Sequence, residues 1–319
     1  MARSSWRRCC RGLRATLLSW RPSLTSECPT PGWEEHRLYY SGSGTDAIAW
    51  LASQVGSPAK SYERPVSWWF IRHWDGGPHI RLRTRPQGAL NVDGMETSFR
   101  QYCSRQESDP DRPKLDEYLA AAGAMAAREG TSSYLSGLVE PGSIRAVTFV
   151  PDRGAFGAHA DSWHLMQSFG FSSALAVDAR QSSSSVQREV LYAVSCAVGI
   201  TFCAGSPVAM TDPSPAAGQY APLPRLEESW CTPRALDRIR GLARNIVDRA
   251  SVELPGDAGS DWIVCWARAS LIVAHMMSSG QQPVFWGRAV HLMANRLGVP
   301  SSAQHSLYCL LDKHLDGRK

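Results

Sequence analysis

Two arginines at alternating positions are the first residues of this 319-residue sequence that could take part in chemistry. Arg81 and Arg83 lie in the stretch VSWWFIRHWDGGPHIRLRTR, which spans residues 66 to 85. A guanidinium group can hold a carboxylate with two hydrogen bonds, and it can also polarise a carbonyl oxygen. Arginines that face each other across a sheet destabilise it unless an anion or carbonyl groups lie among them. This face is therefore either exposed to water or the floor of a binding site.

A second group of candidate residues lies in the stretch PVFWGRAVHLMANRL, residues 283 to 297. Arg288, His291 and Asn295 are separated by three and four residues, so they share one stripe of the expected helix. Histidine can transfer a proton near neutral pH, although a single histidine on a helix is more often structural. The group is suited to acid–base chemistry if its stripe faces a cavity.

The stretch from 66 to 85 is predicted to fold as a β-hairpin. Two runs rich in aromatic and β-branched residues flank Asp75-Gly76-Gly77-Pro78, whose residue types are typical of turns. Side chains alternate between the two faces of a strand, so His79 lies on the same face as Arg81 and Arg83. The hairpin therefore has one polar face in its second strand.

The length of the hairpin loop sets which residues of the first strand join that polar face. A loop of four residues would pair Arg72 with Arg81 and Phe70 with Arg83. Trp68 would then lie on the same face. Aromatic side chains interleaved with arginines favour a binding surface over a solvated one, because exposed clusters of aromatic residues often mark interaction sites.

The rest of the sequence predicts strands first and helices later. Strands are expected at 33–40 and 144–150, and the second of these leads to Asp152. Asp152 is a further candidate for chemistry, although an aspartate at this place also suits a simple turn. Helices are expected at 45–55, 93–105, 114–128, 161–169, 172–180, 186–202, 233–250, 261–278, 283–297 and 301–315. This order indicates an α+β fold with a β-rich N-terminal part, a central hairpin and a largely helical C-terminal half.

The composition is that of a folded protein with one large or two modest domains. The chain is 43% hydrophobic and 20% charged, and it has no apolar run long enough to span a bilayer. Arginines are frequent before the first acidic residue, Glu27, so residues 1–30 form a basic tail. This tail is interpreted as disordered, with a transit segment or an arm for an acidic partner as alternatives. Neither a membrane nor a nucleic acid is expected as a partner, and a homodimer stays open.

The sequence lacks the motifs of the common cofactor-dependent enzymes. It contains no GxGxxG, P-loop, GxSxG or HExxH motif. Its nine cysteines show no zinc-site spacing, and the simplest location for them is a reducing cytoplasm. Nucleotide-dependent enzymes and hydrolases of the common kinds are therefore disfavoured, and no metal or cofactor is expected.

Three blocks of the sequence resemble the glutamate-elimination domain of lantibiotic dehydratases. WWFIRHWDGGPHIRLR is similar to the hairpin that opens that domain, and FVPDRGAFGAHADSWHLMQSFGFSSALAV is similar to the next block. VHLMANRLGV matches the late helix with the family's catalytic histidine, here His291. The blocks occur in family order and cover most of 33–315. The resemblance implies one catalytic domain at 31–319, in which 86–143 is interpreted as an insertion that binds a leader peptide.

The resemblance implies chemistry on a ribosomally made peptide. In the family, a glutamylated serine or threonine loses glutamate to give a dehydroamino acid, and the two hairpin arginines bind the glutamyl group. Here Ala155-Phe156-Gly157-Ala158 stands where the family has arginine before Tyr-Gly-Gly, and Asp152 replaces a glutamate. Alanine cannot bind a carboxylate. This departure favours a related branch, the thiopeptide pyridine synthases, which join two dehydroalanines by a formal aza-[4+2] cycloaddition with loss of water and of the leader peptide.

The resemblance and the chemistry together imply a role for each candidate residue. His291 would move the proton, and Arg81, Arg83 and Asp152 would complete the catalytic group. Contacts with the substrate are expected from Trp68, Phe70, Arg72, His79, Trp286, Arg288, Asn295 and Tyr308. The expected partner is a modified precursor peptide with a leader and a core that contains thiazoles and dehydroalanines, in the cytoplasm of a bacterium.

Two alternatives to the pyridine synthase remain open from the sequence. The first is a separate dehydratase subunit that eliminates glutamate from peptides glutamylated by another protein. The second is a peptide-binding relative that keeps the fold without catalysis.

Overall fold

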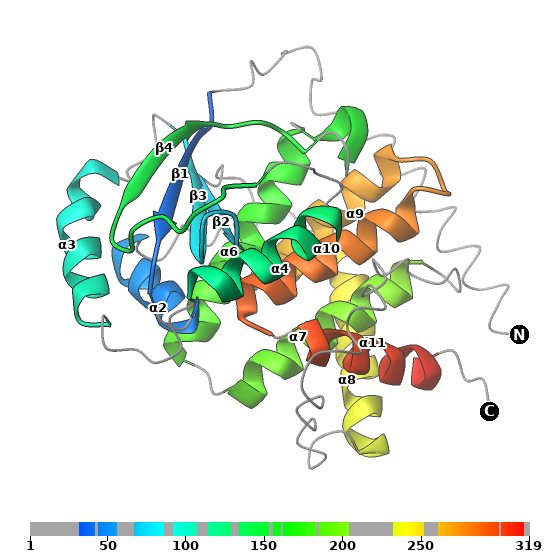
Figure 1. Cartoon of the computed structure of the whole chain (residues 1–319). Helices are drawn as coiled ribbons and strands as arrows, with labels where there is room; N and C mark the ends of the chain where they lie inside the picture. Colours follow the sequence, from blue (N-terminus) through cyan, green and yellow to red (C-terminus); the bar gives the residue numbers. More distant parts are fainter. Residues whose placement is uncertain are drawn as a thin grey trace, which may run out of the picture. The chain divides into compact units, whose positions relative to one another are not determined.

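The computed structural model describes most of the chain beyond its basic tail (Figure 1). The described residues are 32–41, 44–55, 67–85, 92–106, 114–128, 134–152, 156–160, 162–182, 185–203, 232–251, 261–299 and 301–315. The tail 1–30, parts of 86–143, and Ala155 lie outside them. All elements below belong to one compact unit, Trp33–Lys319.

The β-rich part is one antiparallel sheet of four strands. They are β1 (Glu34–Tyr39), β2 (Trp68–His73), β3 (His79–Thr84) and β4 (Ile144–Thr148). Their order across the sheet is β2-β3-β1-β4, so β2 and β4 form its two edges. All four strands lie close to their predicted positions, and the predicted α+β fold is confirmed.

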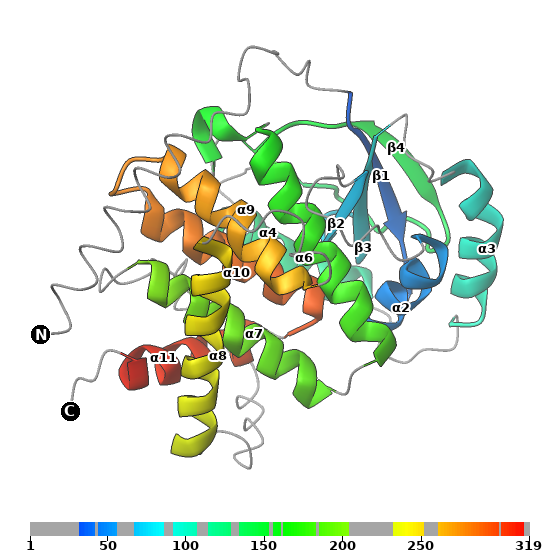
Figure 2. The ribbon, with the colours of Figure 1, turned by 180° about the vertical axis from the view of Figure 1, so that it is seen from behind.

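Helices account for most of the rest of the described structure. The N-terminal ones are α2 (Gly44–Val55), α3 (Val92–Ser104) and α4 (Leu115–Arg128). A short 3-10 helix, η1 (Gly157–His159), precedes the C-terminal set of α6 (Trp163–Ser182), α7 (Ser185–Phe202), α8 (Pro233–Ser251), α9 (Trp262–Met276), α10 (Gln282–Leu297) and α11 (Ser301–Leu315). Both α6 and α10 pack against β2, and Figure 2 shows α6 running beside that strand.

The helix α6 differs from the sequence prediction, which divided it into 161–169 and 172–180. Residues 163–182 form one continuous helix. The only weak former at the predicted break is Gly170, and one glycine costs a helix interior roughly 1 kcal/mol. Burial of the neighbouring Phe169 and Phe171 offsets that cost, so the helix is not interrupted.

The predicted register of the hairpin is wrong by one residue. Arg81 pairs with Ile71, and Arg83 pairs with Trp69. The loop has five residues, 74–78, because Gly77 N–H donates to the Trp74 carbonyl at 2.8 Å within the turn. A shift of one residue moves every side chain of β2 to the other face.

This correction changes which residues accompany the arginines. The face of Arg81 and Arg83 carries Trp69, Ile71 and His73 from β2. The opposite face of β2 carries Trp68, Phe70 and Arg72, which were expected beside the arginines. Trp68 and Phe70 pack there in the hydrophobic core with residues such as Leu82.

The outer edge of β2 is closed by side chains from two helices. Phe70 N–H donates to Ser173 Oγ at 3.1 Å, and its carbonyl accepts from Arg296 Nε at 2.7 Å. The Asn295 amide makes two bonds with the Arg72 peptide groups, accepting at 2.7 Å and donating at 3.0 Å. Asn295 thus pairs with the strand as a neighbouring strand would, and α10 is fixed to the sheet edge.

We expect Asn295→Ala to lower the free energy of unfolding by roughly 2–4 kcal/mol, because two partly buried peptide groups of Arg72 lose their partners. Urea denaturation measures the change. Asn245→Ala makes the same replacement on the exposed side of α8 and serves as the control. The control should change stability by less than about 0.5 kcal/mol. Equal effects of the two substitutions would contradict this assignment of Asn295.

Candidate functional site

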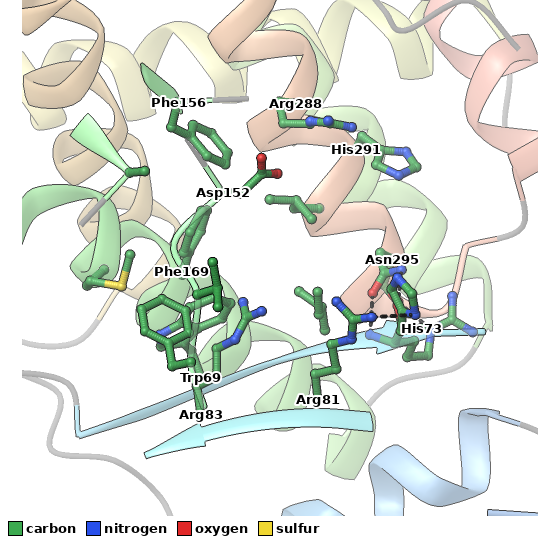
Figure 3. A pocket seen from close by; sticks show the side chains of 17 residues that line it. Trp69, His73, Arg81, Arg83, Asp152, Phe156, Phe169, Arg288, His291 and Asn295 are labelled. Atoms are coloured by element: carbon green, nitrogen blue, oxygen red, sulfur yellow. Dashed lines mark hydrogen bonds between the residues drawn. The ribbon is translucent and has the colours of Figure 1, made fainter. Parts of the chain in front are cut away.

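A cavity of about 500 Å³ lies on the arginine face of the sheet (Figure 3). Its walls come from β2 and β3, from the segment that follows β4, and from α6 and α10. It brings together seven of the predicted site residues, namely Arg72, Arg81, Arg83, Asp152, Arg288, His291 and Asn295. Figure 3 shows Arg81 and Arg83 rising from the strands and Arg288 and His291 projecting from the helix across the cavity.

Five predicted contact residues do not line this cavity. Trp68 and Phe70 lie on the core face of β2, as the corrected register requires. Trp286 is 1% exposed and stacks on Phe202 within the helical core. The remaining two, His79 and Tyr308, are also buried. None of the five is therefore placed beside the arginines in this cavity, and their contact with a substrate stays a prediction.

The cavity has an aromatic end and a polar end. Trp69, Phe149, Phe156 and Phe169 line the first, and Arg83 lies among them. The Arg83 guanidinium carbon is 4.2 Å from the centre of the Trp69 ring and 4.9 Å from that of Phe149. Guanidinium groups stack favourably on aromatic rings. The aromatic end thus holds one cationic donor in a fixed position beside apolar surface.

The anion that the arginine face requires is a residue of the chain itself, Glu35. It lies on β1 directly opposite Arg83 and is 4% exposed. Its carboxylate accepts from Arg83 Nε at 2.7 Å and from Arg37 Nε at 3.3 Å, and it lies 3.9 Å from Arg81 Nε. Burial acts to raise the pKa of Glu35, but the charges of the three arginines and the Arg83 hydrogen bond outweigh it, so the pKa lies below 4.5. The carboxylate is therefore ionised at neutral pH.

We expect Glu35→Gln to lower the free energy of unfolding by about 3–5 kcal/mol at pH 7, because the buried arginines lose their counter-charge. Glu34→Gln, on the exposed side of the same strand, is the matched control and should change stability by less than about 0.5 kcal/mol.

The effect of Glu35→Gln should also depend on pH. A carboxyl group with a lowered pKa stabilises the folded state above its unfolded pKa, and this contribution is lost as the pH falls through the folded pKa. The difference from the wild type should therefore shrink below pH 4.5. A difference that is constant with pH, or one no larger than for Glu34→Gln, would contradict the role of Glu35.

Two histidines fix the orientation of Arg81. Arg81 Nη2 donates to His73 Nδ1 at 3.0 Å, and Arg81 Nε donates to His79 Nε2 at 3.4 Å. Arginine cannot accept hydrogen bonds, so both ring nitrogens must be acceptors. Burial lowers the pKa of His79 to about 3, which keeps its ring neutral, and its Nδ1–H donates to the Gly77 carbonyl at 3.0 Å. His79 is thus a positioning residue below the cavity.

The polar end contains His291, whose tautomer is set by Gln304. The Gln304 Nε2 group donates to the Val299 carbonyl at 2.9 Å, which leaves its Oε1 as the acceptor near His291. His291 Nδ1 lies 3.0 Å from that oxygen and therefore carries a proton. In the neutral ring Nε2 is then the nitrogen with the lone pair. His291 is thus arranged to accept a proton at Nε2, as a general base must.

We expect Gln304→Met to lower kcat by about 10-fold to 100-fold with a small change in KM, because His291 would no longer be held in one tautomer. The pH at which kcat reaches half its maximum should shift as well, which a purely structural role would not cause. Tyr192→Phe is the control, since the Tyr192 hydroxyl donates to the Gln304 backbone carbonyl, at 3.3 Å, and not to the Gln304 side chain. A kcat and pH profile like those of the wild type would contradict the positioning role.

The sequence alone does not single out Glu35, His73 or Gln304. Glu35 and His36 lie on opposite faces of the predicted first strand. Glu35 could therefore be placed near the arginines from the sequence only if the order of the strands were known. His73 joins the site only in the corrected register. Gln304 lies on a different helix from His291, and no spacing in the sequence connects the two.

Two kinds of feature are absent from the described residues. No group of three histidine, cysteine, aspartate or glutamate side chains within them is placed to hold a metal ion. No helix among them is long and apolar enough to cross a membrane.

Comparisons with known proteins identify the family. The model for the C-terminal part of lantibiotic biosynthesis dehydratases matches residues 33–315, so the chain belongs to this family, as the three blocks predicted. The structure is similar to the pyridine synthase TbtD from thiomuracin biosynthesis, with 15% identity and a TM-score of 0.55 over 90% of this chain and 98% of that one. It is also similar to the tRNA-dependent lantibiotic dehydratase MibB from Microbispora sp. 107891, with 18% identity and a TM-score of 0.43 over 93% of this chain and 29% of that one. No curated protein matches the sequence.

Proposed function

We propose that this protein is a cofactor-independent pyridine synthase that acts on a modified precursor peptide. It would join two dehydroalanines by a formal aza-[4+2] cycloaddition, with loss of water and of the leader peptide. The observation that carries the proposal is the occupation of the arginine face by Glu35. In a dehydratase the hairpin arginines bind the substrate's glutamyl group. Here the chain's own carboxylate takes that place, which favours a neutral peptide as substrate.

The family and the fold support this proposal. Membership in the dehydratase C-terminal family makes a ribosomally made peptide the natural substrate class. The fold is shared with a pyridine synthase over nearly the whole length of that protein. The aromatic end of the cavity offers ring faces on which flat heterocycles such as thiazoles can stack.

The first step of the reaction converts a backbone amide into a 2-azadiene. The amide nitrogen loses its proton and the carbonyl oxygen gains one. His291 Nε2 is the proposed acceptor of the nitrogen proton, because its neutral ring has the lone pair there. Arg81 or Arg83 would donate to the oxygen on which negative charge develops.

The later steps need no oxidant. Cycloaddition forms two carbon–carbon bonds between the azadiene and the second dehydroalanine. Water then leaves with one ring hydrogen, and the leader leaves as a carboxamide with another, which gives the aromatic pyridine. Asp152 and Arg288 line the same cavity and are the proposed proton donor and charge partner for these departures.

The second candidate function is elimination of glutamate from a glutamylated serine or threonine. Family membership favours it, since the family's model describes dehydratases. The pairing of Arg83 and Arg81 with Glu35 disfavours it, because a glutamyl carboxylate would have to compete with a buried carboxylate already in place.

Two incubations distinguish these functions. A leader-bearing peptide that contains thiazoles and dehydroalanines should lose the mass of water plus its leader, as measured by mass spectrometry. The same peptide with glutamylated serines should remain unchanged. His291→Ala should lower turnover at least 100-fold, whereas His275→Ala, an exposed histidine on α9, should leave it within about twofold. Conversion of the glutamylated peptide alone would overturn the proposal.

A further inference from the structure

The two edges of the sheet differ in how their backbone groups are satisfied. In an antiparallel sheet, successive residues of an edge strand direct their peptide groups inward and outward in turn. Tyr39 N–H donates to the Ser143 carbonyl at 3.1 Å, and alternation from this bond turns outward the peptide groups of Ile144, Ala146 and Thr148. Within the described part of the chain, no hydrogen bond reaches these outward groups.

The two edges contrast, because the outward groups are bonded on β2 and open on β4 among the described residues. On β2 the outward groups of Phe70 and Arg72 make four bonds to side chains of α6 and α10. On β4 the corresponding positions, Ala146 and Thr148, are exposed. An exposed edge strand is a ready template for another extended chain.

The open edge leads directly into the cavity. Phe149, Val150 and Asp152 follow β4 without interruption, and all three line the cavity wall. Val150 is 71% exposed, which places apolar surface at the junction of edge and cavity. Four residues span at most about 14 Å, so a chain paired with β4 would have its next residues within reach of the cavity.

Charge defines the kind of chain that fits this edge. Arg145 projects from β4 on the face that also carries Arg37 and Arg81, since the pairing sets Arg145 opposite Arg37 and Arg37 opposite Arg81. Arg145 is exposed and has no carboxylate partner among the described residues, while Arg37 is paired with Glu35. An acidic side chain directly across from an arginine stabilises a strand pair.

We propose that an extended, acidic segment of the peptide substrate adds to β4 as a fifth strand and thereby directs its reacting residues into the cavity. Main-chain bonds to Ile144, Ala146 and Thr148 would supply affinity, and Arg145 would select for acidic residues. The proposal rests on the proposed function only in taking a peptide as the substrate. Binding can be measured without turnover, so failure of the edge and failure of the chemistry are distinguishable.

The test removes one outward donor from β4. Ala146→Pro deletes an N–H that does not bond to β1, and proline is tolerated on edge strands. The probe is a fluorescein-labelled, unmodified precursor peptide encoded in the gene neighbourhood of the protein, and fluorescence anisotropy gives its Kd. We expect Ala146→Pro and Arg145→Glu each to raise Kd at least tenfold. Ala146→Val keeps the N–H and should stay within twofold.

Hydrogen exchange on the wild type gives a second measurement that does not depend on a substitution. The peptide should slow exchange at the amides of Ile144, Ala146 and Thr148. The amides of Phe70 and Arg72 on the closed edge should exchange equally with and without peptide. An unchanged Kd in a folded Ala146→Pro variant, or unchanged exchange along β4, would overturn the proposal. The proposal would also be overturned if Ala146→Pro dissociated a dimer without changing the affinity for the peptide. The edge would then join two copies of the chain.

Discussion

The floor of the cavity depends on one buried carboxylate among three arginines. Strand pairing places Arg37 beside Arg81 and Glu35 beside Arg83, so β1 and β3 present like charges to each other at their centre. Removing charges from water is costly, and only a close counter-charge with good hydrogen bonds offsets that cost. Glu35 provides it with a 2.7 Å bond to Arg83 and contacts with the other two arginines. The same pairing leaves these arginines suited to polarise neutral carbonyl groups rather than to capture a second carboxylate.

The two-residue period of the strands determines which side chains and peptide groups surround the cavity floor. It places Trp69, Ile71 and His73 on the cavity face and sends Phe70 into the core. It also determines which peptide groups point out of the sheet. On β2 those groups are bonded by Asn295, Arg296 and Ser173, and this fixes α10, with His291, across the cavity from Arg81. Fold stability and site geometry therefore share the same hydrogen bonds.

Much of this arrangement follows from the sequence, and the errors have physical causes. Turn residues and alternation were sufficient to predict the hairpin, and helical spacing placed Arg288 and His291 on one stripe. The register failed because the two glycines allow a five-residue loop, and its extra residue, Trp74, reverses every side chain of β2. The sequence places Asn295 on the stripe of His291 but does not reveal its bonds to β2, because a polar residue in a helix carries no sign of which element it bonds. Glu35 and Gln304 act through pairs distant in sequence, which only the packed chain brings together.

The central claim is that Glu35 takes the place of a substrate glutamyl group, and a comparison of two ligands tests it most directly. One peptide carries dehydroalanine, and its partner carries 2,3-diaminopropionate in place of serine, joined to glutamate through a stable amide link. Their dissociation constants for the wild-type protein should agree within about threefold, because Arg81 and Arg83 already hold a carboxylate. Glu35→Gln should favour the glutamyl peptide. A glutamyl peptide that binds the wild type tenfold or more tightly than its dehydroalanine counterpart would contradict the account.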